Sequence, residues 1–363
     1  MNAQHQVPEQ FQTQPQPQPY PAEQISAERI HGGPDRFGIP RFDFSTNSNA
    51  CGPCLSVQTL VAQADASHYP DATYTQLRRQ IASLHGVDVP RVVLAASASE
   101  FIYRITAWLA QQGGRSVWVP QYSYGDYAHA AHAHRVSVVA EISDAALRWS
   151  CEPSSPLGVA HSDFEALLKP TTRPGMFAAN VLDRAYEPLR LEGELALSQA
   201  QLQTFWQLWS PNKALGLTGV RAAYAIAPVD AGNAIETLEQ LCPSWPLGAH
   251  GVALLQAWIG SDAHIWLARS LDILRGWKVR QIALCESLGW TCLPSNANFF
   301  CAQPALPAGV TLPEVLGQLR THGIKLRDAT SFGLPGHVRV SVQPPAAQDA
   351  LLTAWQHIMK TSI

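Results

Sequence analysis

The chain has 363 residues, of which 46% are hydrophobic and 15% are charged, so it is long enough to bury a large core in a two-lobed enzyme or in two ordinary domains. Its formal net charge of -3 argues against a protein that binds nucleic acid through a basic surface or a membrane through a polybasic anchor. Small molecules are therefore the expected partners.

The first 28 residues are rich in Gln and Pro and contain almost no apolar side chain to bury, so they are expected to form a disordered tail. This segment has neither the apolar region of a signal peptide nor a membrane-spanning helix, so the cytoplasm is the expected location. The odd number of scattered cysteines fits reduced thiols in that compartment: Cys51, Cys54, Cys151, Cys242, Cys285, Cys292 and Cys301.

The segment 49–54, NACGPC, has the Cys-x-x-Cys spacing of thiol-disulfide oxidoreductases. In those proteins a buried strand leads into the first cysteine and a helix follows it. Here the preceding residues, DFSTNSNA, are polar and typical of turns, and Gly-Pro is itself a turn sequence. We therefore expect a loop without redox function, and no second cysteine pair or spaced histidine pair follows that would complete a zinc site.

From about Tyr69 onwards, short apolar runs alternate with helical patterns, which predicts a parallel or mixed α/β sheet. Later the pattern changes to that of an α+β lobe. Strands are expected at 91–96, 116–120, 136–142, 175–183, within 202–209, at 220–227 and at 337–343. Helices are expected at 99–112, 127–134, around 254, at 264–288 and at 313–322. We predict one two-lobed subunit with an N-terminal arm at 29–60, a large domain at 61–240 and a small domain at 241–363.

The histidines of YAHAAHAH (His129, His132 and His134) could place two imidazole rings one turn apart on a helix. Without a carboxylate or a cysteine at ligand spacing, we expect a solvent-facing side of a helix and no metal site.

Three segments contain residues suited to catalysis. Lys213 follows a strand and lies among small residues that let a ligand approach, so it is a candidate Schiff-base former, although a surface loop lysine would have a similar pattern. Asp183 ends an apolar run, where a carboxylate is costly unless it meets a cation such as a protonated pyridine nitrogen or caps the strand end. Segment 95–100, AASASE, offers backbone N–H groups and hydroxyls to a phosphate.

With these segments in this order, the chain resembles the fold-type I enzymes that use pyridoxal 5'-phosphate, and within them the histidinol-phosphate aminotransferase-like group. The similarity runs from about His31 to near the C-terminus. The sequence HGG followed by DFSTNSNACGP resembles in particular the L-threonine-O-3-phosphate decarboxylases of cobalamin biosynthesis. The resemblance implies an α/β fold, in which a large domain with a mixed, mostly parallel sheet is joined to a smaller α+β domain. It also implies a homodimer with shared active sites.

The resemblance implies roles for individual cofactor-binding residues. The phosphate of the cofactor would be held by Ala98, Ser99, Ser210, Arg221 and, from the neighbouring subunit, Tyr69. The pyridine ring would be held by stacking on Tyr124, by Asp183 at its nitrogen, by Tyr186 and Ser155 near its hydroxyl, and by a covalent bond to Lys213.

The same resemblance assigns the substrate side of the site. Arg339 would bind the substrate carboxylate, Arg327 and His31 are candidates for a substrate phosphate, and Asn47 is the first asparagine of the family's Asn-x-Asn-Pro segment. For Arg327 and His31 a structural or solvent-exposed role remains open. The chain departs from the family pattern at Ser155, which stands in place of an asparagine, so altered tuning of the cofactor is expected.

The expected reaction is decarboxylation of L-threonine O-3-phosphate to (R)-1-aminopropan-2-yl phosphate. The alternative is an aminotransferase of histidinol phosphate or of an amino acid, because the sequence does not decide which bond at the substrate Cα stands perpendicular to the ring. A cofactor-binding regulator and an inactive paralogue are two further alternatives, and the chain contains no helix-turn-helix that would favour the first.

Overall fold

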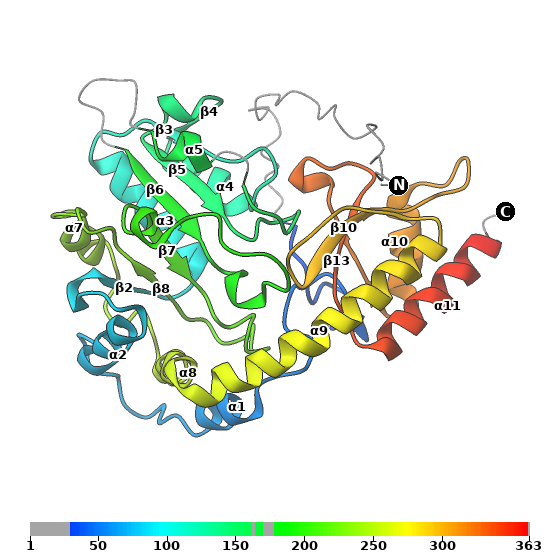
Figure 1. Ribbon diagram of the computed structural model, residues 1–363, viewed down its shortest axis with the longest axis horizontal. Coiled ribbons are helices and arrows are strands. Elements are labelled where there is room, and N and C mark those ends of the chain that lie inside the picture. Colours follow the sequence, from blue (N-terminus) through cyan, green and yellow to red (C-terminus); the bar gives the residue numbers. More distant parts are fainter. Residues whose placement is uncertain (1–29, 162–163, 170–177, 362–363) are drawn as a thin grey trace, which may run out of the picture.

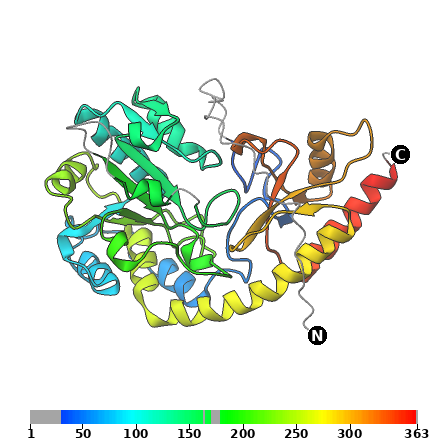
Figure 2. The same ribbon diagram turned by 45° about the horizontal axis from the view of Figure 1, so that its top comes forward.

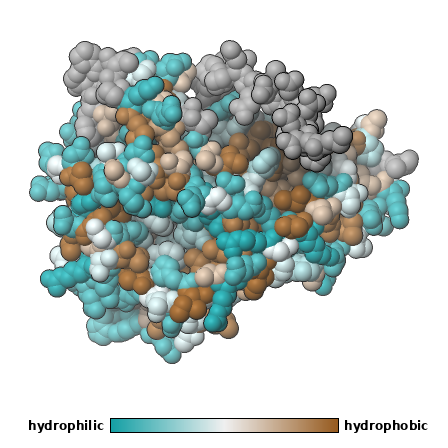
Figure 3. All heavy atoms as spheres, viewed as in Figure 1, coloured by the Kyte–Doolittle hydropathy of each residue, from teal (hydrophilic) through white to brown (hydrophobic). Residues whose placement is uncertain are grey.

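The computed structural model describes residues 30–161, 164–169 and 178–361 of the chain. The predicted tail at 1–28 and the first residues of the strand predicted at 175–183 lie outside these ranges. Within the described ranges, every helix is too short or too polar to span a lipid bilayer. The face of the molecule seen in Figure 3 carries hydrophilic and hydrophobic residues side by side.

Seven strands of the described chain form one mixed sheet in the large lobe (Figure 1). Their spatial order is β2-β8-β7-β6-β5-β3-β4, and among these strands β8 runs in the direction opposite to the other six. The predicted mixed, mostly parallel sheet is therefore confirmed. Its strands are β2 (Val92–Ala95), β3 (Ser116–Trp118), β4 (Ser137–Val139), β5 (Leu147–Cys151), β6 (Ala179–Asp183), β7 (Trp206–Trp209) and β8 (Ala223–Ile226).

Helices cover both faces of this sheet. Alternate residues of a strand point to opposite sides, and here the residues on both sides are apolar and are buried under helices. Val92 and Leu94 of β2 pack in a core cluster with one set of helices, whereas Val93 and Ala95 pack in a second cluster with another. The first set is α1 (Leu55–Ala62), α2 (Thr75–His85) and α8 (Ala249–Ile259). The second set is α3 (Ala98–Gln111), α4 (Gly125–Ala133) and α7 (Ala234–Gln240). The short helices α5 (Phe164–Leu167) and α6 (Gln199–Leu202) lie in connections between strands.

The small lobe is built on an antiparallel sheet, in which four strands of the described chain have the order β12-β13-β10-β9. The helix α9 (Ser261–Ser287) runs along one side of the molecule from the large lobe to the small lobe (Figures 1 and 2). The remaining elements are β9 (Thr291–Cys292), β10 (Phe299–Gln303), α10 (Leu312–Thr321), β11 (Ile324–Lys325), β12 (Arg327–Asp328), β13 (Val338–Ser341) and α11 (Pro345–Thr361). The strand β1 (Phe42–Asp43) pairs in parallel with β11 and so ties the N-terminal segment to this lobe.

The strands β5, β6 and β7 end at the same edge of the large sheet. In the register of the sheet, Cys151 lies opposite Asp183, and Asp183 lies opposite Leu208. The loop after β7 begins at Ser210 and leads to Lys213. Parallel strands therefore bring the ends of three separate sequence segments to one place, as is usual for ligand sites in open α/β sheets.

Candidate active site

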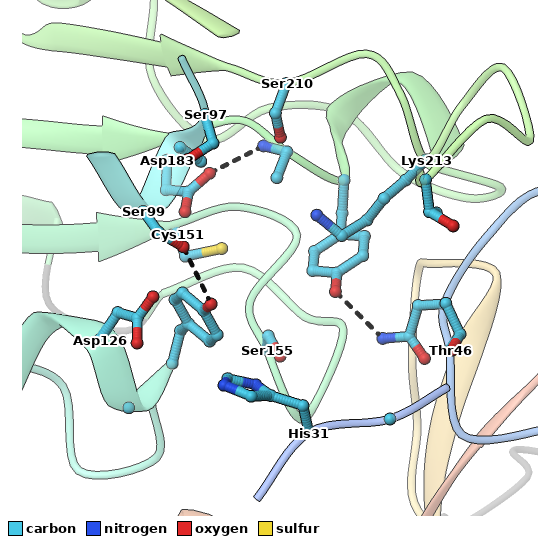
Figure 4. A pocket seen from close by; sticks show the side chains of 18 of the residues that line it. His31, Thr46, Ser97, Ser99, Asp126, Cys151, Ser155, Asp183, Ser210 and Lys213 are labelled. Carbon is cyan, nitrogen blue, oxygen red and sulfur yellow. Dashed lines mark hydrogen bonds between the residues drawn. The ribbon is translucent and has the colours of Figure 1, made fainter. Parts of the chain in front are cut away.

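A cavity of about 350 Å³ lies at this edge of the sheet. Residues of the large lobe, of the small lobe and of the N-terminal segment contribute to its wall, and Figure 4 shows several of them around the open space. Of the residues singled out in the sequence, the cavity is lined by His31, Asn47, Ala98, Ser99, Tyr124, Ser155, Asp183, Tyr186, Ser210, Lys213, Arg221, Arg327 and Arg339.

Asp183 presents a buried carboxylate at the end of β6, with 5% of its surface exposed. Its Oδ2 accepts a hydrogen bond of 2.7 Å from the hydroxyl of Tyr127, and its Oδ1 accepts one of 2.9 Å from the amide of Ala185. Burial raises the pKa of Asp183, whereas the bonds from Tyr127 and Ala185 and the charge of Lys213 lower it. The carboxylate is thus held in one orientation.

Lys213 is partly buried in the loop that follows β7. Its Nζ lies 5.4 Å from the centre of the Tyr186 ring. Among the described residues no acidic side chain lies within ion-pair distance of this amine. Asn49 fixes the backbone of the loop, since its amide donates a 2.9 Å hydrogen bond to the carbonyl oxygen of Lys213.

The N-terminus of α3 opens onto the same cavity. Ser97 caps the helix by accepting a hydrogen bond from the amide of Glu100, and Ser99 shares a hydrogen bond of 3.2 Å with the hydroxyl of Tyr124. Ser210 lies nearby with a buried hydroxyl oxygen that has no hydrogen-bond partner among the described residues. Free backbone N–H groups at a helix start and an unpartnered hydroxyl are features that fit an anionic group.

Glu100 belongs to segment 95–100, which the sequence predicted as suited to a phosphate. The structure instead pairs the Glu100 carboxylate with Arg104 at 2.9 Å, and Glu100 is absent from the cavity wall, where Ser97 takes part.

Two arginines of the small lobe lie side by side in the wall, because Arg327 on β12 is the register partner of Arg339 on β13. Arg339 donates to the hydroxyl oxygen of Ser155 at 3.1 Å and to the carbonyl oxygen of Ser45 at 3.0 Å. Arg327 donates to Ser331 and to the carbonyl oxygen of Ile30, each at 2.7 Å. No carboxylate of a described residue pairs with either guanidinium group. Burial, reinforced by Arg339, lowers the pKa of Arg327 to about 10.

The N-terminal segment closes one side of the cavity. The ring of His31 lies 6.3 Å from the ring of Tyr124, and Asn47 donates a hydrogen bond of 3.3 Å to the hydroxyl of Tyr186. A side chain at Gly32 would lie 2.2 Å from the carbonyl oxygen of Ser45, so only glycine fits there.

Tyr69 differs from the other predicted residues, because it does not line this cavity. Its side chain is 78% exposed and stacks on Trp245 with ring centres 4.4 Å apart. The role implied for Tyr69 concerns a neighbouring subunit, so it stays a prediction.

Several cavity residues were not among the predicted site residues, including Tyr127, Cys151, Asp126 and His129. The prediction that these histidines face solvent is correct for His132, which is exposed. It is wrong for His129, whose Nδ1 is buried and lies 4.0 Å from a carboxylate oxygen of Asp126. The spacing of three residues between Asp126 and His129 on one helix was the signal available.

The sequence model described as aminotransferase class I and II matches residues 42–181 and 149–355. Histidinol-phosphate aminotransferase 1 of Thiobacillus denitrificans is 28% identical over 330 residues, which cover 82% of this chain and 80% of that protein. Histidinol-phosphate aminotransferase 2 of Caulobacter vibrioides is 28% identical over 346 residues, which cover 88% of this chain and 87% of that protein.

Solved structures of similar fold include the histidinol-phosphate aminotransferase from Clostridium acetobutylicum, with a TM-score of 0.75, 18% identity and coverage of 88% and 99% of the two chains. The L-threonine-O-3-phosphate decarboxylase from Porphyromonas gingivalis has a TM-score of 0.71, 21% identity and coverage of 87% and 99%. The histidinol-phosphate aminotransferase from Sinorhizobium meliloti, solved in complex with pyridoxal-5'-phosphate, has a TM-score of 0.71, 18% identity and coverage of 88% and 90%. At these identities the likeness establishes the fold.

Proposed function

The chain belongs to the aminotransferase class I and II family, and from this premise we propose that it decarboxylates an amino acid that carries a phosphate, with L-threonine O-3-phosphate as the first substrate to test. The cofactor is pyridoxal 5'-phosphate. The observation that carries the proposal is the pair Arg327 and Arg339, two buried guanidinium groups without a described carboxylate partner in the cavity that also contains Lys213 and Asp183.

The described residues fit this cofactor. We assign its phosphate to the N-terminus of α3, to the unpartnered hydroxyl of Ser210 and to Arg221. Asp183 would face the ring nitrogen, and Tyr124 would stack on the ring. The amine of Lys213, free of an acidic partner among the described residues, would bind the cofactor aldehyde covalently. When bound, pyridoxal phosphate accepts the electron pair that is released when a bond to the substrate Cα breaks.

The arginine pair would orient the substrate in the cavity. Two fixed cations bind a substrate with two anionic groups in one orientation, and a guanidinium group binds carboxylate or phosphate through two parallel hydrogen bonds. We assign the substrate carboxylate to Arg339 and the phosphate to Arg327 with His31. Placing the carboxylate perpendicular to the ring favours loss of carbon dioxide, after which a proton is delivered to Cα.

The position of the N-terminal segment supports the decarboxylase assignment. His31 lines the cavity, and the carbonyl oxygen of the preceding residue, Ile30, accepts a hydrogen bond from Arg327. The HGG sequence by which the chain resembles threonine-phosphate decarboxylases therefore lies beside the proposed phosphate site. The assignment to cobalamin biosynthesis depends on this sequence resemblance alone.

A second candidate is amino-group transfer on histidinol phosphate or an amino acid, which the names of the curated relatives favour. In that case Lys213 would move the Cα proton, and the arginine pair would bind the two carboxylates of a dicarboxylic amino donor. The same residues serve both candidates, so the reaction must be decided by measurement.

We also propose a homodimer in which Tyr69 reaches the cofactor phosphate of the partner. Tyr69 and Trp245 stack on each other and are 78% and 41% exposed, which supports this arrangement. Sedimentation at concentrations used for the assays tests the dimer directly.

The deciding experiment incubates the enzyme loaded with pyridoxal phosphate with L-threonine O-3-phosphate and, separately, with histidinol phosphate plus 2-oxoglutarate. Release of carbon dioxide with formation of an aminopropyl phosphate supports decarboxylation, whereas formation of glutamate supports transfer. Lys213→Ala should abolish either activity and the borohydride-trapped cofactor adduct, while Lys360→Ala, which removes an exposed lysine of α11, serves as the matched control. Failure of both reactions in enzyme that binds the cofactor would overturn the proposal.

A further inference from the structure

The hydroxyl of Tyr127 makes the strongest contact that the Asp183 carboxylate has in the described structure, a hydrogen bond of 2.7 Å. Neither the sequence patterns nor the assignments above give Tyr127 a function. Both side chains are buried, with Tyr127 at 0% and Asp183 at 5% exposure. A hydrogen bond to a charged group in such a place contributes more than a bond at the surface, because water does not compete for the carboxylate.

Neighbouring aromatic rings hold the Tyr127 side chain in place. Its ring stacks on the ring of Trp149 with centres 4.4 Å apart and planes only 9° from parallel. The ring of Tyr124 meets it edge-on at 5.8 Å. Trp149 lies in β5, the strand next to Asp183 in the sheet, so the hydroxyl of Tyr127 is fixed relative to the strand that carries the carboxylate.

The hydrogen bond also affects the charge of Asp183. Burial raises the pKa of this carboxyl group, and the Tyr127 hydroxyl is the largest of the influences that lower it, ahead of the Ala185 amide and Lys213. Cys151, the register partner of Asp183, is a further titratable group nearby, and burial and the charge of Asp183 raise the pKa of its thiol. Removal of the hydroxyl would leave an acceptor oxygen of the carboxylate without its main partner.

We propose that Tyr127 is a positioning residue, which orients the Asp183 carboxylate toward the cavity and keeps it charged so that it can hold a protonated ring nitrogen of the cofactor. The part that concerns the cofactor rests on the proposed role of Asp183. The orientation and charge of Asp183 are properties of the protein by itself and can be measured separately.

Tyr127→Phe tests the proposal, since it removes one oxygen and keeps the ring on Trp149. The matched control is Tyr224→Phe in β8, which removes another fully buried hydroxyl. That hydroxyl forms hydrogen bonds with His85 and Trp258 and does not contact Asp183. Protein labelled with 13C at the aspartate carboxyl carbons is titrated without cofactor, with Asp183→Asn used to identify the resonance. The expected result for Tyr127→Phe is an Asp183 pKa that rises by about one to two units, with no such change in Tyr224→Phe.

A role that is only structural would lower the midpoint of thermal unfolding in both variants and leave the Asp183 titration unchanged, and that result would overturn the proposal. Affinity for pyridoxal phosphate, measured by equilibrium dialysis, is expected to fall about tenfold in Tyr127→Phe. If the titration shifts as expected while the affinity stays at the wild-type value, Tyr127 positions Asp183 but the proposed role of Asp183 toward the cofactor is wrong.

Discussion

The backbone amide of Asn49 donates a hydrogen bond of 2.9 Å to the carbonyl oxygen of Lys213. The side chain of Asn49 donates to the next carbonyl, that of Ala214, and the amide of Cys54 donates to the carbonyl of Leu215. The loop that contains Cys-Gly-Pro-Cys thus holds three consecutive residues of the loop that presents the lysine.

The same segment reaches the small lobe. The carbonyl oxygen of Ser45 accepts a hydrogen bond from Arg339, and the amide of Phe44 donates to the carbonyl of Lys325. Residues 42–54 therefore connect the arginine assigned to the substrate carboxylate with the loop of Lys213. The loop that contains Cys-Gly-Pro-Cys therefore has a structural role, which is to hold the loop of Lys213 in place.

Gly216→Ala should disturb this contact. Gly216 has φ +70°, and a Cβ atom there would lie 2.6 Å from the carbonyl oxygen of Gly52. We expect the free energy of unfolding to fall by about 1 to 3 kcal/mol in urea titrations, because an L side chain is strained at this φ and collides with backbone. Gly219→Ala is the matched control, since no atom of a described residue lies within 4 Å of its added Cβ and its φ is not positive. Equal losses in both variants would contradict the proposed contact.

Cys51→Ser combined with Cys54→Ala should leave turnover within about twofold of wild type, in the presence or absence of a thiol reductant. Burial raises the pKa of the Cys51 thiol, so little thiolate forms near neutral pH. Cys54 is 1% exposed and directly precedes α1. The check is the turnover rate after treatment with oxidised or reduced glutathione. Activity that is lost on oxidation in wild type and spared in the double variant would instead support a redox function.

Local patterns in the sequence were sufficient for six of the seven strands of the large sheet in the described chain, because short apolar runs between turn residues mark buried strands wherever they are continuous. Strand β5 was missed since Arg148 and Ser150 interrupt its apolar run, although both side chains are buried in the structure. Arg148 satisfies part of its guanidinium group through the carbonyl of Lys169, a partner that the sequence of the strand does not indicate.

The site required more than local patterns. Asp183 stands out because it ends a buried strand, and Lys213 because it follows another; the family resemblance then indicated the arginines. Tyr127 and its partner Asp183 are 56 positions apart in the sequence. Asn49 is 165 positions from Ala214, its partner in the loop of Lys213. Such contacts depend on how the strands and loops pack in three dimensions, so neither could be predicted from spacing.

Ser155→Ala should weaken binding of the substrate carboxylate. The Ser155 hydroxyl oxygen accepts a 3.1 Å hydrogen bond from Arg339, and the side chain is 4% exposed. Without that acceptor the guanidinium group loses one of its two fixed contacts, so we expect KM to rise about tenfold with a smaller change in kcat.

The neighbouring Ser154→Ala is the control for Ser155→Ala. In the wild type, the hydroxyl of Ser154 accepts a hydrogen bond from the amide of Val159, and Ser154 does not line the cavity. This variant should lower stability and keep the wild-type KM. A KM that is unchanged in Ser155→Ala would show that Ser45 alone is sufficient to hold Arg339.

His85 should make the protein less stable in mild acid. Its ring is packed near Trp209 at 5.0 Å, and its Nε2 shares a hydrogen bond of 2.9 Å with the hydroxyl of Tyr224. Burial and the charge of Arg184 lower the pKa of His85 to about 4, from an ordinary value of 6.5. Between these two values the unfolded chain binds a proton that the folded chain does not, so stability falls as the pH falls from about 6.5 toward about 4.

His85→Gln removes this proton uptake while it keeps a polar group near Tyr224. From urea titrations at about pH 7.5 and about pH 4.5, we expect the wild type to lose up to about 3 kcal/mol more than the variant on acidification. His132→Gln, which removes an exposed histidine of α4, is the control for the loss of a titratable ring. Equal losses in the wild type and in His85→Gln would mean that His85 takes up its proton in the folded protein as readily as in the unfolded chain.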